Sequence, residues 1–349
     1  MNIEPGLAVT MDWGGTWIRV STVNSAGQII WQDRCPSPRN ATQPQLVAVA
    51  KTMLDMAIVQ SGGRPPGVGI AVAGPVDTAT GTLHEPPNLR PLDGVSFKSL
   101  WEDTLGCPVY VGNDATLAAL GEFYYGAGEE ARRQGATPTT LVYMTVSTGI
   151  GGGIVDRGQM FVGAGGLAGE VGHMTIDYTP SAPPCLCGSQ GCLETLASGT
   201  AIARIARERL GTSSGRASTL SSLAPPNITS ETVFRAANAG DAMCREIVED
   251  IVHSLGVSLA NMLHLYNPDI VVLGGGVTVG LQDLNLIEKI RSIMDARAMS
   301  SRHKDYVLSA SKLGDSVGLI GAAALVPVSY THLRAHETRH DLVCRLLLE

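Results

Sequence analysis

The chain of 349 residues has no excess of positive charge and no long apolar run. Its 25 lysines and arginines are outnumbered by 32 acidic residues, and the net charge of -7 disfavours nucleic acid or an anionic membrane as the main partner. No apolar stretch reaches the roughly 20 residues needed to cross a bilayer, and the N-terminus lacks a basic region followed by an apolar one. We therefore expect a cytoplasmic protein with no membrane partner and no nucleic-acid partner.

A disulfide framework is also poorly supported. The chain has 7 cysteines, an odd number, and most of them are scattered. The clustered ones lie in GHMTIDYTPSAPPCLCGSQGCLE, residues 172–194. The motif CLCG lacks the C-x-x-C spacing of a redox dithiol, and a disulfide across a single intervening residue would be strained. This usage indicates a reducing compartment and one metal site.

The same stretch has the ligand set of a tetrahedral zinc site. Its soft and borderline ligands, spaced H-x11-C-x-C-x4-C, are His173, Cys185, Cys187 and Cys192. Three thiolates and one imidazole leave no position for an activated water, so we expect a structural Zn²⁺. Glu170 and Glu194 flank the cluster. A metal-pinned loop would hold both carboxylates where they could accept hydrogen bonds from sugar hydroxyls; the alternative is that they are solvated loop acids.

A Walker or Rossmann loop is missing as well. Strands are predicted at 7–12, 17–23 and 28–34, with the turn WGGT after the first, and the pattern recurs at 140–146, where STGIGGG follows. β-forming residues come after each glycine turn, whereas a Walker or Rossmann loop leads into a helix. Two hairpins of this kind predict two similar lobes that face one another.

The rest of the chain predicts an alternation of helices and strands. Helices are expected near 44–60, 199–211, 241–267 and 286–294, and strands at 67–74, 107–112 and 269–276. The Ser/Pro-rich segment Thr212 to Asn227 is the best candidate for a mobile loop.

Three glycine-rich turns are candidate phosphate or nucleotide contacts. Backbone N–H groups can approach a phosphate closely at glycine, a threonine adds a hydroxyl donor, and an aspartate can hold the water shell of Mg²⁺. The candidates are Asp12, Gly14, Gly15 and Thr16 in the first turn, Ser147, Thr148, Gly149 and Gly151 in the second, and Gly274, Gly275 and Gly276 in a third, against which adenosine could lie. Ordinary hairpin and strand-to-helix turns are the alternative.

Asn113 and Asp114 come just before a predicted helix, in GNDATLAALGE. Structurally, Asp114 could simply be the N-cap. Functionally, a carboxylate at a helix N-terminus stays ionised at neutral pH and could accept the proton of a hydroxyl that attacks a phosphorus atom.

These motifs resemble those of the ROK family, the repressor, open reading frame and kinase group that includes bacterial glucokinase-type sugar kinases. The motifs run in family order across about residues 7 to 326 and comprise DWGGTWIR, GIAVAGPVD, PPNL, GNDATLAALGE, STGIGGGI, GAGGLAGEVGHM, CLCGSQGCLE, NPDIVVLGGGV and GLIGAAAL. The pairing of GEVGH with CLCGSQGCLE is highly specific. Trp13, Trp17 and Gly112 depart from the residues commoner at their positions.

The resemblance implies an α/β fold of the actin-like, hexokinase-like ATPase type. Each of its two lobes would have a mixed β-sheet flanked by helices, with the active site in the cleft between the lobes. We expect residues 1–112 plus about 313–327 in the small lobe and residues 113–312, with the zinc loop 173–192, in the large lobe. By the same resemblance Asp114 would be the catalytic base, and the sugar contacts would be Asn88, Asn113, Asp114, Glu170, His173 and Glu194.

The expected activity is ATP-dependent phosphorylation of a hexose, with glucose first and N-acetylglucosamine, N-acetylmannosamine, mannose, fructose or allose behind it. ATP, Mg²⁺ and a structural Zn²⁺ are the expected cofactors, and a homodimer or homotetramer is the expected assembly. The rival hypotheses are a sugar-sensing regulator that does not catalyse and an actin-like ATPase chaperone. With eleven residues before Asp12, we expect no helix-turn-helix segment there. Residues 328–349 resemble a translated sequencing-adapter artefact and are expected to be a non-native tail; the alternative is an exposed basic helix.

Overall fold

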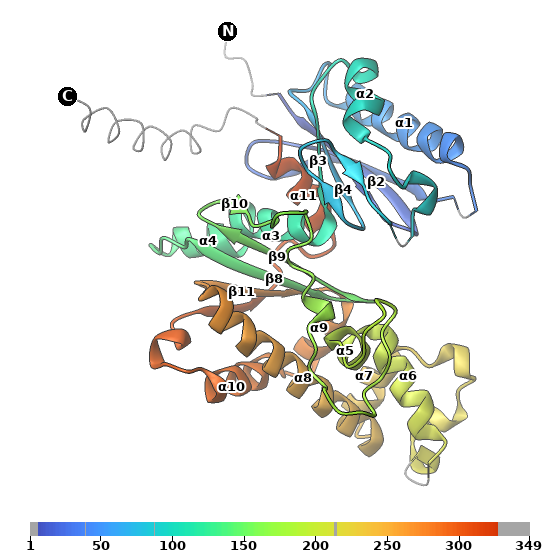
Figure 1. Ribbon diagram of the computed structural model, residues 1–349, viewed down its shortest axis with the longest axis vertical. Helices are drawn as coiled ribbons and strands as arrows, with labels where there is room; N and C mark the ends of the chain where they lie inside the picture. The colour runs from blue at the N-terminus through green and yellow to red at the C-terminus, as the bar shows by residue number, and fades with distance from the viewer. Residues whose placement is uncertain (1–5, 39, 87, 213–214, 327–349) are drawn as a thin grey trace, which may run out of the picture. The chain divides into compact units, whose positions relative to one another are not determined.

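The computed structural model describes residues 6–38, 40–86, 88–212 and 215–326, so the predicted tail 328–349 lies outside the described residues. Contacts along the chain divide it into two compact units (Figure 1). Unit 1 consists of Met1–Asp114 with Gly318–Glu349, and unit 2 of Ala115–Val317. The sequence-based division placed the corresponding boundaries after residues 112 and 312.

Unit 1 is built on a five-stranded sheet of order β3-β2-β1-β4-β7. Its strands are β1 (Ala8–Trp13), β2 (Trp17–Val23), β3 (Ile29–Pro36), β4 (Val68–Val72) and β7 (Val109–Asn113). The first three form an antiparallel meander, and β4 and β7 run parallel to β1. The helices of unit 1 are α1 (Gln43–Gln60), α2 (Phe97–Leu105) and α11 (Val317–Ala324), whose first residue belongs to unit 2, and a small ribbon pairs β5 (Val76–Asp77) with β6 (Thr82–Leu83).

Unit 2 repeats this topology with the order β10-β9-β8-β11-β12. Its strands are β8 (Thr140–Val146), β9 (Ile150–Asp156), β10 (Gln159–Met160), β11 (Ile270–Gly274) and β12 (Val307–Ala310). Its helices are α3 (Asp114–Tyr125), α4 (Ala127–Arg133), α5 (Leu193–Ala197), α6 (Gly199–Leu210), α7 (Ser230–Asn238), α8 (Ala242–Tyr266), α9 (Gly276–Asp283) and α10 (Ile287–Arg297). A 3-10 turn, η2 (Val171–His173), packs on β9.

The repeated strand order confirms the predicted actin-like duplication. In each sheet three antiparallel strands are followed by two that run parallel to the first. In sheets of this kind ligands bind beyond the carboxyl ends of the parallel strands. The two glycine turns, which follow β1 and β8, lie at that edge of their own sheets.

Trp13, one of the departures from the family pattern, belongs to an aromatic core in unit 1. Its indole is fully buried and stacks on Phe97 at 5.6 Å and on Trp101 at 6.2 Å between ring centroids. Both partners come from α2, a helix that the sequence reading missed. Buried aromatic side chains contribute large apolar areas, so this cluster fixes α2 against β1, directly before the first glycine turn.

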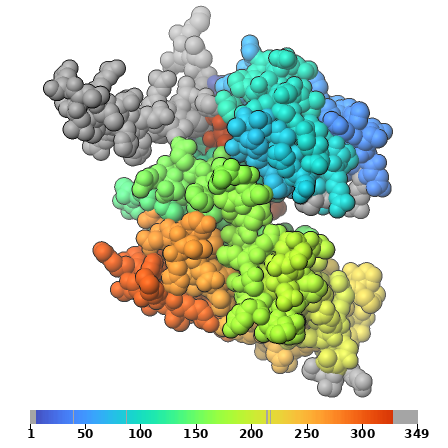
Figure 2. Space-filling model, viewed as in Figure 1, coloured from blue at the N-terminus to red at the C-terminus, as the bar shows by residue number. Residues whose placement is uncertain are grey.

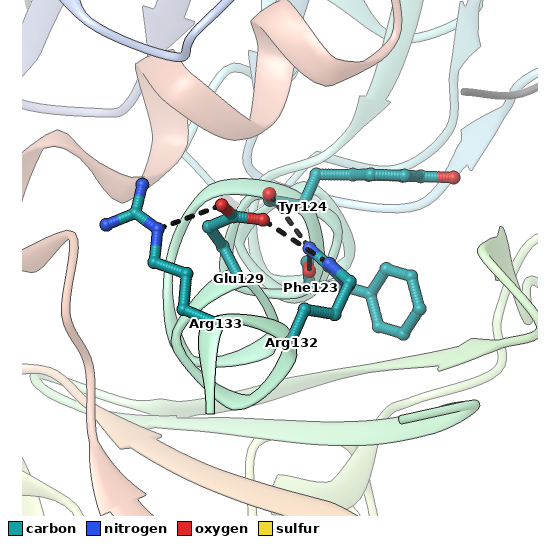
Figure 3. A network of polar contacts seen from close by, with 5 residues as sticks. All are labelled: Phe123, Tyr124, Glu129, Arg132 and Arg133. Carbon is teal, nitrogen blue, oxygen red and sulfur yellow. Dashed lines mark hydrogen bonds and ion pairs between the residues drawn. The ribbon is translucent and has the colours of Figure 1, made fainter. Parts of the chain in front are cut away.

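In unit 2 a second helix, α4, is fixed against the C-terminal end of α3. Arg132 donates hydrogen bonds to the carbonyl oxygens of Phe123 and Tyr124, at 2.7 and 3.0 Å, which the last turn of a helix leaves without intrahelical partners (Figure 3). Glu129 pairs with both Arg132 and Arg133. The helix that begins at Asp114 is thereby capped at its far end.

Glu122 secures α3 to the loop that follows β12. Its carboxylate is fully buried and accepts hydrogen bonds from Ser311 Oγ at 2.6 Å, Lys312 N at 2.9 Å and Ala127 N at 2.9 Å. A buried carboxylate is tolerated when its oxygens are satisfied in this way. The Glu122 carboxylate therefore connects α3, at the start of unit 2, to the loop after β12, near the end of unit 2.

The segment predicted as a mobile loop, Thr212 to Asn227, forms short 3-10 turns in its described part and is anchored by Asp241. Asp241 caps α8 through Cys244 N at 3.1 Å and also accepts from Ser218 Oγ at 2.8 Å and Thr219 N at 2.7 Å. Burial alone would raise the pKa of Asp241, but these hydrogen bonds outweigh it and lower the pKa to about 2.

Among the described residues, the helices are all too short or too polar to span a bilayer.

Candidate active site

The first glycine turn, Gly14–Thr16, connects β1 to β2 in unit 1. Gly14 N–H donates to the carbonyl of Trp17 at 3.0 Å, which closes the hairpin, and Thr16 is exposed. Asp12 lies on β1 just before the turn and is only 8% exposed. Its carboxylate forms an ion pair with Arg19, its cross-strand neighbour on β2. Burial raises the pKa of Asp12, and the Arg19 guanidinium opposes that rise.

Three of the predicted sugar contacts also lie in unit 1, one beside its glycine turn and two where β7 passes into α3. A Cβ atom at Gly15 would lie 2.6 Å from Cβ of Asn88, so the side chain of Asn88 packs directly on the turn. Asn113 ends β7 and donates from Nδ2 to the carbonyl of Gly74 at 3.1 Å. Asp114 follows as the first residue of α3 and is half-buried, at the helix end that favours an ionised carboxylate.

In unit 2, a pocket of about 370 Å³ brings together three of the predicted nucleotide contacts: Ser147, Thr148 and Gly276. Sequence reasoning missed the other lining residues, which come from α6, from α9 and from the start of α7 and comprise Gly199, Thr200, Ala203, Arg207, Ile228, Thr229, Ser230 and Val277. The lining is mainly hydroxyl groups and small side chains, with one arginine and no carboxylate. Such a lining suits a polar, anionic ligand.

Arg207 and the helix caps shape this pocket. Arg207 donates to the carbonyl oxygens of Pro225 and Ile228, both at 3.1 Å, and so fixes the segment that leads into α7. Thr229 caps α7 with a capping box. The sequence carried a signal for this helix start, a threonine at the N-cap position ahead of an apolar periodicity, but none for the carbonyl contacts of Arg207.

The triple glycine after β11 turns the chain tightly into α9. Gly275 has φ of 86°, and a Cβ there would lie 2.3 Å from the carbonyl oxygen of Val146, so only glycine fits. Gly274 ends β11, and a Cβ at Gly276 would meet nothing within 4 Å. Of the three, Gly276 is the exposed one that faces the pocket.

The second glycine turn is shorter than predicted. The chain turns within Ser147–Gly149, and β9 begins at Ile150. Gly151 is therefore a strand residue, paired with Thr145 of β8, and a Cβ there would lie 3.1 Å from Cβ of Ala115. Close packing against α3, and not a turn, accounts for this glycine.

The structure brings the predicted zinc ligands together in unit 2. One ligand atom from each of His173, Cys185, Cys187 and Cys192 lies within 4.8 Å of every other. The Sγ atoms of Cys187 and Cys192 are 3.7 Å apart, and Cys185 Sγ is 3.6 Å from His173 Nδ1. In a tetrahedral site with Zn–S bonds of about 2.3 Å, sulfur atoms lie about 3.8 Å apart, so the donor set and its spacing fit zinc.

Packing against β9 fixes the residues on either side of the cluster. His173 is the last residue of η2, and a Cβ at the preceding Gly172 would lie 2.1 Å from the carbonyl oxygen of Ile150. Glu170 precedes η2 and is exposed. Glu194 lies in the first turn of α5, and its Oε2 accepts a hydrogen bond from Ile150 N at 2.8 Å. One of the two predicted carboxylate contacts is therefore already bound to the second glycine turn.

The surroundings of the Cys192 thiol oppose its ionisation. Burial and the neighbouring Cys185 and Cys187 raise the pKa of Cys192 to about 12. A bound divalent cation supplies the positive charge that such a thiolate requires.

Two sheets of one topology, each with a glycine turn at its carboxyl edge, define an actin-like, hexokinase-like α/β protein. The ROK family model matches residues 8–328. The chain belongs to the ROK family.

Its relatives include both kinases and regulators. A glucokinase of Halalkalibacterium halodurans is 33% identical over 323 residues, which cover 91% of this chain and 94% of the relative. The xylose repressor of Caldicellulosiruptor bescii is 27% identical over 329 residues, with 93% of this chain and 79% of the repressor covered. Among solved structures, a ROK family glucokinase from Streptomyces griseus in complex with glucose and AMPPNP has a TM-score of 0.74 at 30% identity, covering 92% of this chain and 99% of that one.

Proposed function

We propose that this protein transfers the γ-phosphoryl group of MgATP to a hydroxyl group of a hexose, with glucose as the first candidate. The observation that carries the proposal is the position of Asp114 between the end of β7 and the first turn of α3. Similarity to a glucokinase along 94% of its length supports the reaction class. N-acetylhexosamines, mannose, fructose and allose are the alternative acceptors, and a homodimer or homotetramer stays a prediction.

In the proposed reaction Asp114 acts as the general base. Its carboxylate accepts the proton of the sugar hydroxyl at C6 while that oxygen forms a bond to the γ-phosphorus and the bond to the bridging oxygen of ADP breaks. The N-terminal end of α3 favours the ionised carboxylate. Asn113, held by the Gly74 carbonyl, would orient the same sugar.

The two glycine turns would bind the nucleotide. The pocket lined by Ser147, Thr148 and Gly276 supports this for unit 2, since its hydroxyl and backbone N–H groups can donate to phosphate or ribose oxygens. In unit 1, Gly15 and Thr16 would offer similar donors, while Gly14, whose N–H is bonded to the carbonyl of Trp17, would let the phosphate approach the backbone closely. Asp12 would act on the water shell of Mg²⁺ in MgATP, with Arg19 partly neutralising its charge.

Sugar recognition would come from Asn88, Asn113, Glu170, His173 and Glu194.

We further propose that the cluster of His173, Cys185, Cys187 and Cys192 holds a structural Zn²⁺, which would cross-link the side chains of its loop. In the space-filling view this loop lies on the surface of unit 2, in the yellow-green region (Figure 2). The side chain of Leu186, between Cys185 and Cys187, is fully exposed.

A sugar-sensing regulator is the second candidate, because a xylose repressor matches 93% of the chain. A sensor needs a sugar pocket but no base and no nucleotide contacts. The presence of Asp114 together with the hydroxyl-lined pocket favours the kinase.

The test is ADP release by the purified protein with MgATP and a panel of hexoses and N-acetylhexosamines. We expect turnover with at least one hexose, and Asp114→Asn should lower kcat roughly 100- to 10,000-fold while sugar binding persists. Asp103→Asn, at an exposed position on α2, is the matched control. Undiminished kcat in Asp114→Asn would remove the assigned base, and tight sugar binding without any turnover would favour the sensor.

A further inference from the structure

Glu194 accepts a hydrogen bond from the protein backbone, a contact that its predicted role in sugar binding does not explain. It is half-buried in the first turn of α5, and its Oε2 accepts a hydrogen bond from Ile150 N at 2.8 Å. Ile150 is the first residue of β9, directly after the turn Ser147–Gly149. The carboxylate thus binds the backbone at the point where the turn ends.

The same carboxylate leaves no room for a side chain at Gly149. A Cβ atom at this position would lie 2.5 Å from Glu194 Oε2 and 3.3 Å from its Cδ, and those are the only atoms it would meet within 4 Å. No left-handed φ demands a glycine there. The lack of a side chain at Gly149 is therefore accounted for by the approach of Glu194, and any larger residue must push the carboxylate away.

The other side of the turn is held by the next helix. Gly199 N donates to the carbonyl of Ser147 at 2.7 Å, and the Oγ1 of Thr200 donates to the carbonyl of Thr148 at 2.8 Å. Both donors belong to the start of α6, which follows α5 after the single residue Ser198. Together with Glu194, the corner between α5 and α6 fixes the turn from both of its ends.

We propose that Glu194 is a positioning residue for the nucleotide: by holding Ile150 N and Gly149, it keeps the turn Ser147–Gly149 in the conformation that binds phosphate oxygens. The inference rests on the proposed kinase function and deepens it. If Glu194 only contacted sugar, its loss would weaken sugar binding and leave nucleotide affinity in the absence of sugar unchanged. If it positions the turn, nucleotide affinity must fall even when no sugar is present.

The experiment is calorimetric titration of the full chain with a non-hydrolysable ATP analogue and Mg²⁺, without sugar. The proteins compared are wild type, Glu194→Ala, Glu194→Gln, Gly149→Ala and the double variant. Loss of a hydrogen bond to a charged acceptor predicts roughly tenfold weaker binding for Glu194→Ala. Glu194→Gln should stay within about threefold of wild type, since its amide oxygen can still accept from Ile150 N.

The double variant supplies the matched control. Gly149→Ala should weaken nucleotide binding in the wild-type background by displacing the carboxylate, but it should have no further effect in the Glu194→Ala background, where the obstructing oxygen is gone. Hydrogen–deuterium exchange of β8 and α8 verifies that each variant is folded.

The outcomes separate the two proposals. Non-additive losses in Glu194→Ala and Gly149→Ala support the positioning role. Wild-type affinity in Glu194→Ala, or additive effects in the double variant, overturns it and leaves the kinase proposal standing. Failure of the wild-type protein to bind the analogue at all refutes the kinase proposal and the positioning role with it.

Discussion

Replacing Asp241 by asparagine tests whether one buried carboxylate holds the segment beside the nucleotide pocket. Asp241 caps α8 and accepts hydrogen bonds from Ser218 and Thr219, in the segment that continues to Ile228 and Thr229 in the pocket lining. An asparagine keeps the size of the side chain but removes its charge and one of its two acceptor oxygens.

The size of the expected stability change follows from the hydrogen bonds to Asp241, which lower its pKa to about 2 in the folded protein from the ordinary aspartate value of 3.8. A folded pKa below the unfolded one stabilises the protein above the unfolded pKa, and the stabilisation is lost as pH falls through the folded pKa. At about 1.4 kcal/mol per pH unit the contribution is about 2 kcal/mol at pH 7, and roughly half of it remains at pH 3. Asp241→Asn should therefore destabilise unit 2 by about 2 to 3 kcal/mol at pH 7 and by clearly less at pH 3.

The assay must report on unit 2, and tryptophan fluorescence does not, because the four tryptophans of the chain, at positions 13, 17, 31 and 101, all lie in unit 1. Hydrogen–deuterium exchange of the amides of Thr219 and Cys244 reports directly on the two backbone contacts. When variant and wild type are compared at the same pH, the contributions of the other carboxylates to stability are the same in both proteins and cancel. Asp283→Asn, at an exposed position, is the control and should change stability by less than about 0.5 kcal/mol. An effect of Asp241→Asn that is equally large at pH 3 and pH 7 would refute the charge-based account.

Two further predictions concern other parts of unit 2. Glu122→Ala removes a buried carboxylate that accepts from the amide of Lys312, and it should destabilise unit 2 by about 3 kcal/mol. Faster hydrogen–deuterium exchange at Lys312 would show the loss, and unchanged exchange there would mean that the carboxylate does not secure this loop. Cys187→Ser should reduce the zinc content measured by mass spectrometry and should weaken sugar binding. Leu186→Ser, at the adjacent and fully exposed position, is the control and should retain both zinc and sugar binding. Zinc retained at the wild-type level in Cys187→Ser would exclude the four-ligand site.

Features set by local sequence were predictable. The glycine turns after β1 and β8, the long helix α8 and the triple glycine after β11 each follow from a periodicity or from turn residues within a short window. The meeting of His173 with the three clustered cysteines was predictable for a different reason: these residue types are chemically rare and closely spaced, so few other structures would use them together. The zinc ion itself stays a prediction.

Contacts between distant segments were not predictable from the sequence. Nothing near Asp241 indicates that it anchors Ser218 and Thr219, because the hydrogen bonds span more than 20 residues. The position of Glu194 beside the cysteines and the family resemblance predict a sugar contact, but its bond to Ile150 depends on how α5 packs on β9. Gly151 was assigned to a turn because a run of glycines gives no sign of where a strand begins.

The duplicated topology does not imply duplicated chemistry, and the register of the two hairpins shows why. One residue before the end of β1, Asp12 pairs across the hairpin with Arg19; at the corresponding place in β8, Thr145 pairs with Gly151. The first hairpin thus places an ion pair beside its turn, whereas the second leaves room for α3 to pack and receives its carboxylate, Glu194, from a separate helix. Strand order is set by backbone hydrogen bonding and tolerates either arrangement, so the fold is repeated while the charges around the two turns are not. The acid beside the first turn is placed by the hairpin itself, and the acid beside the second by α5, the helix that begins directly after Cys192.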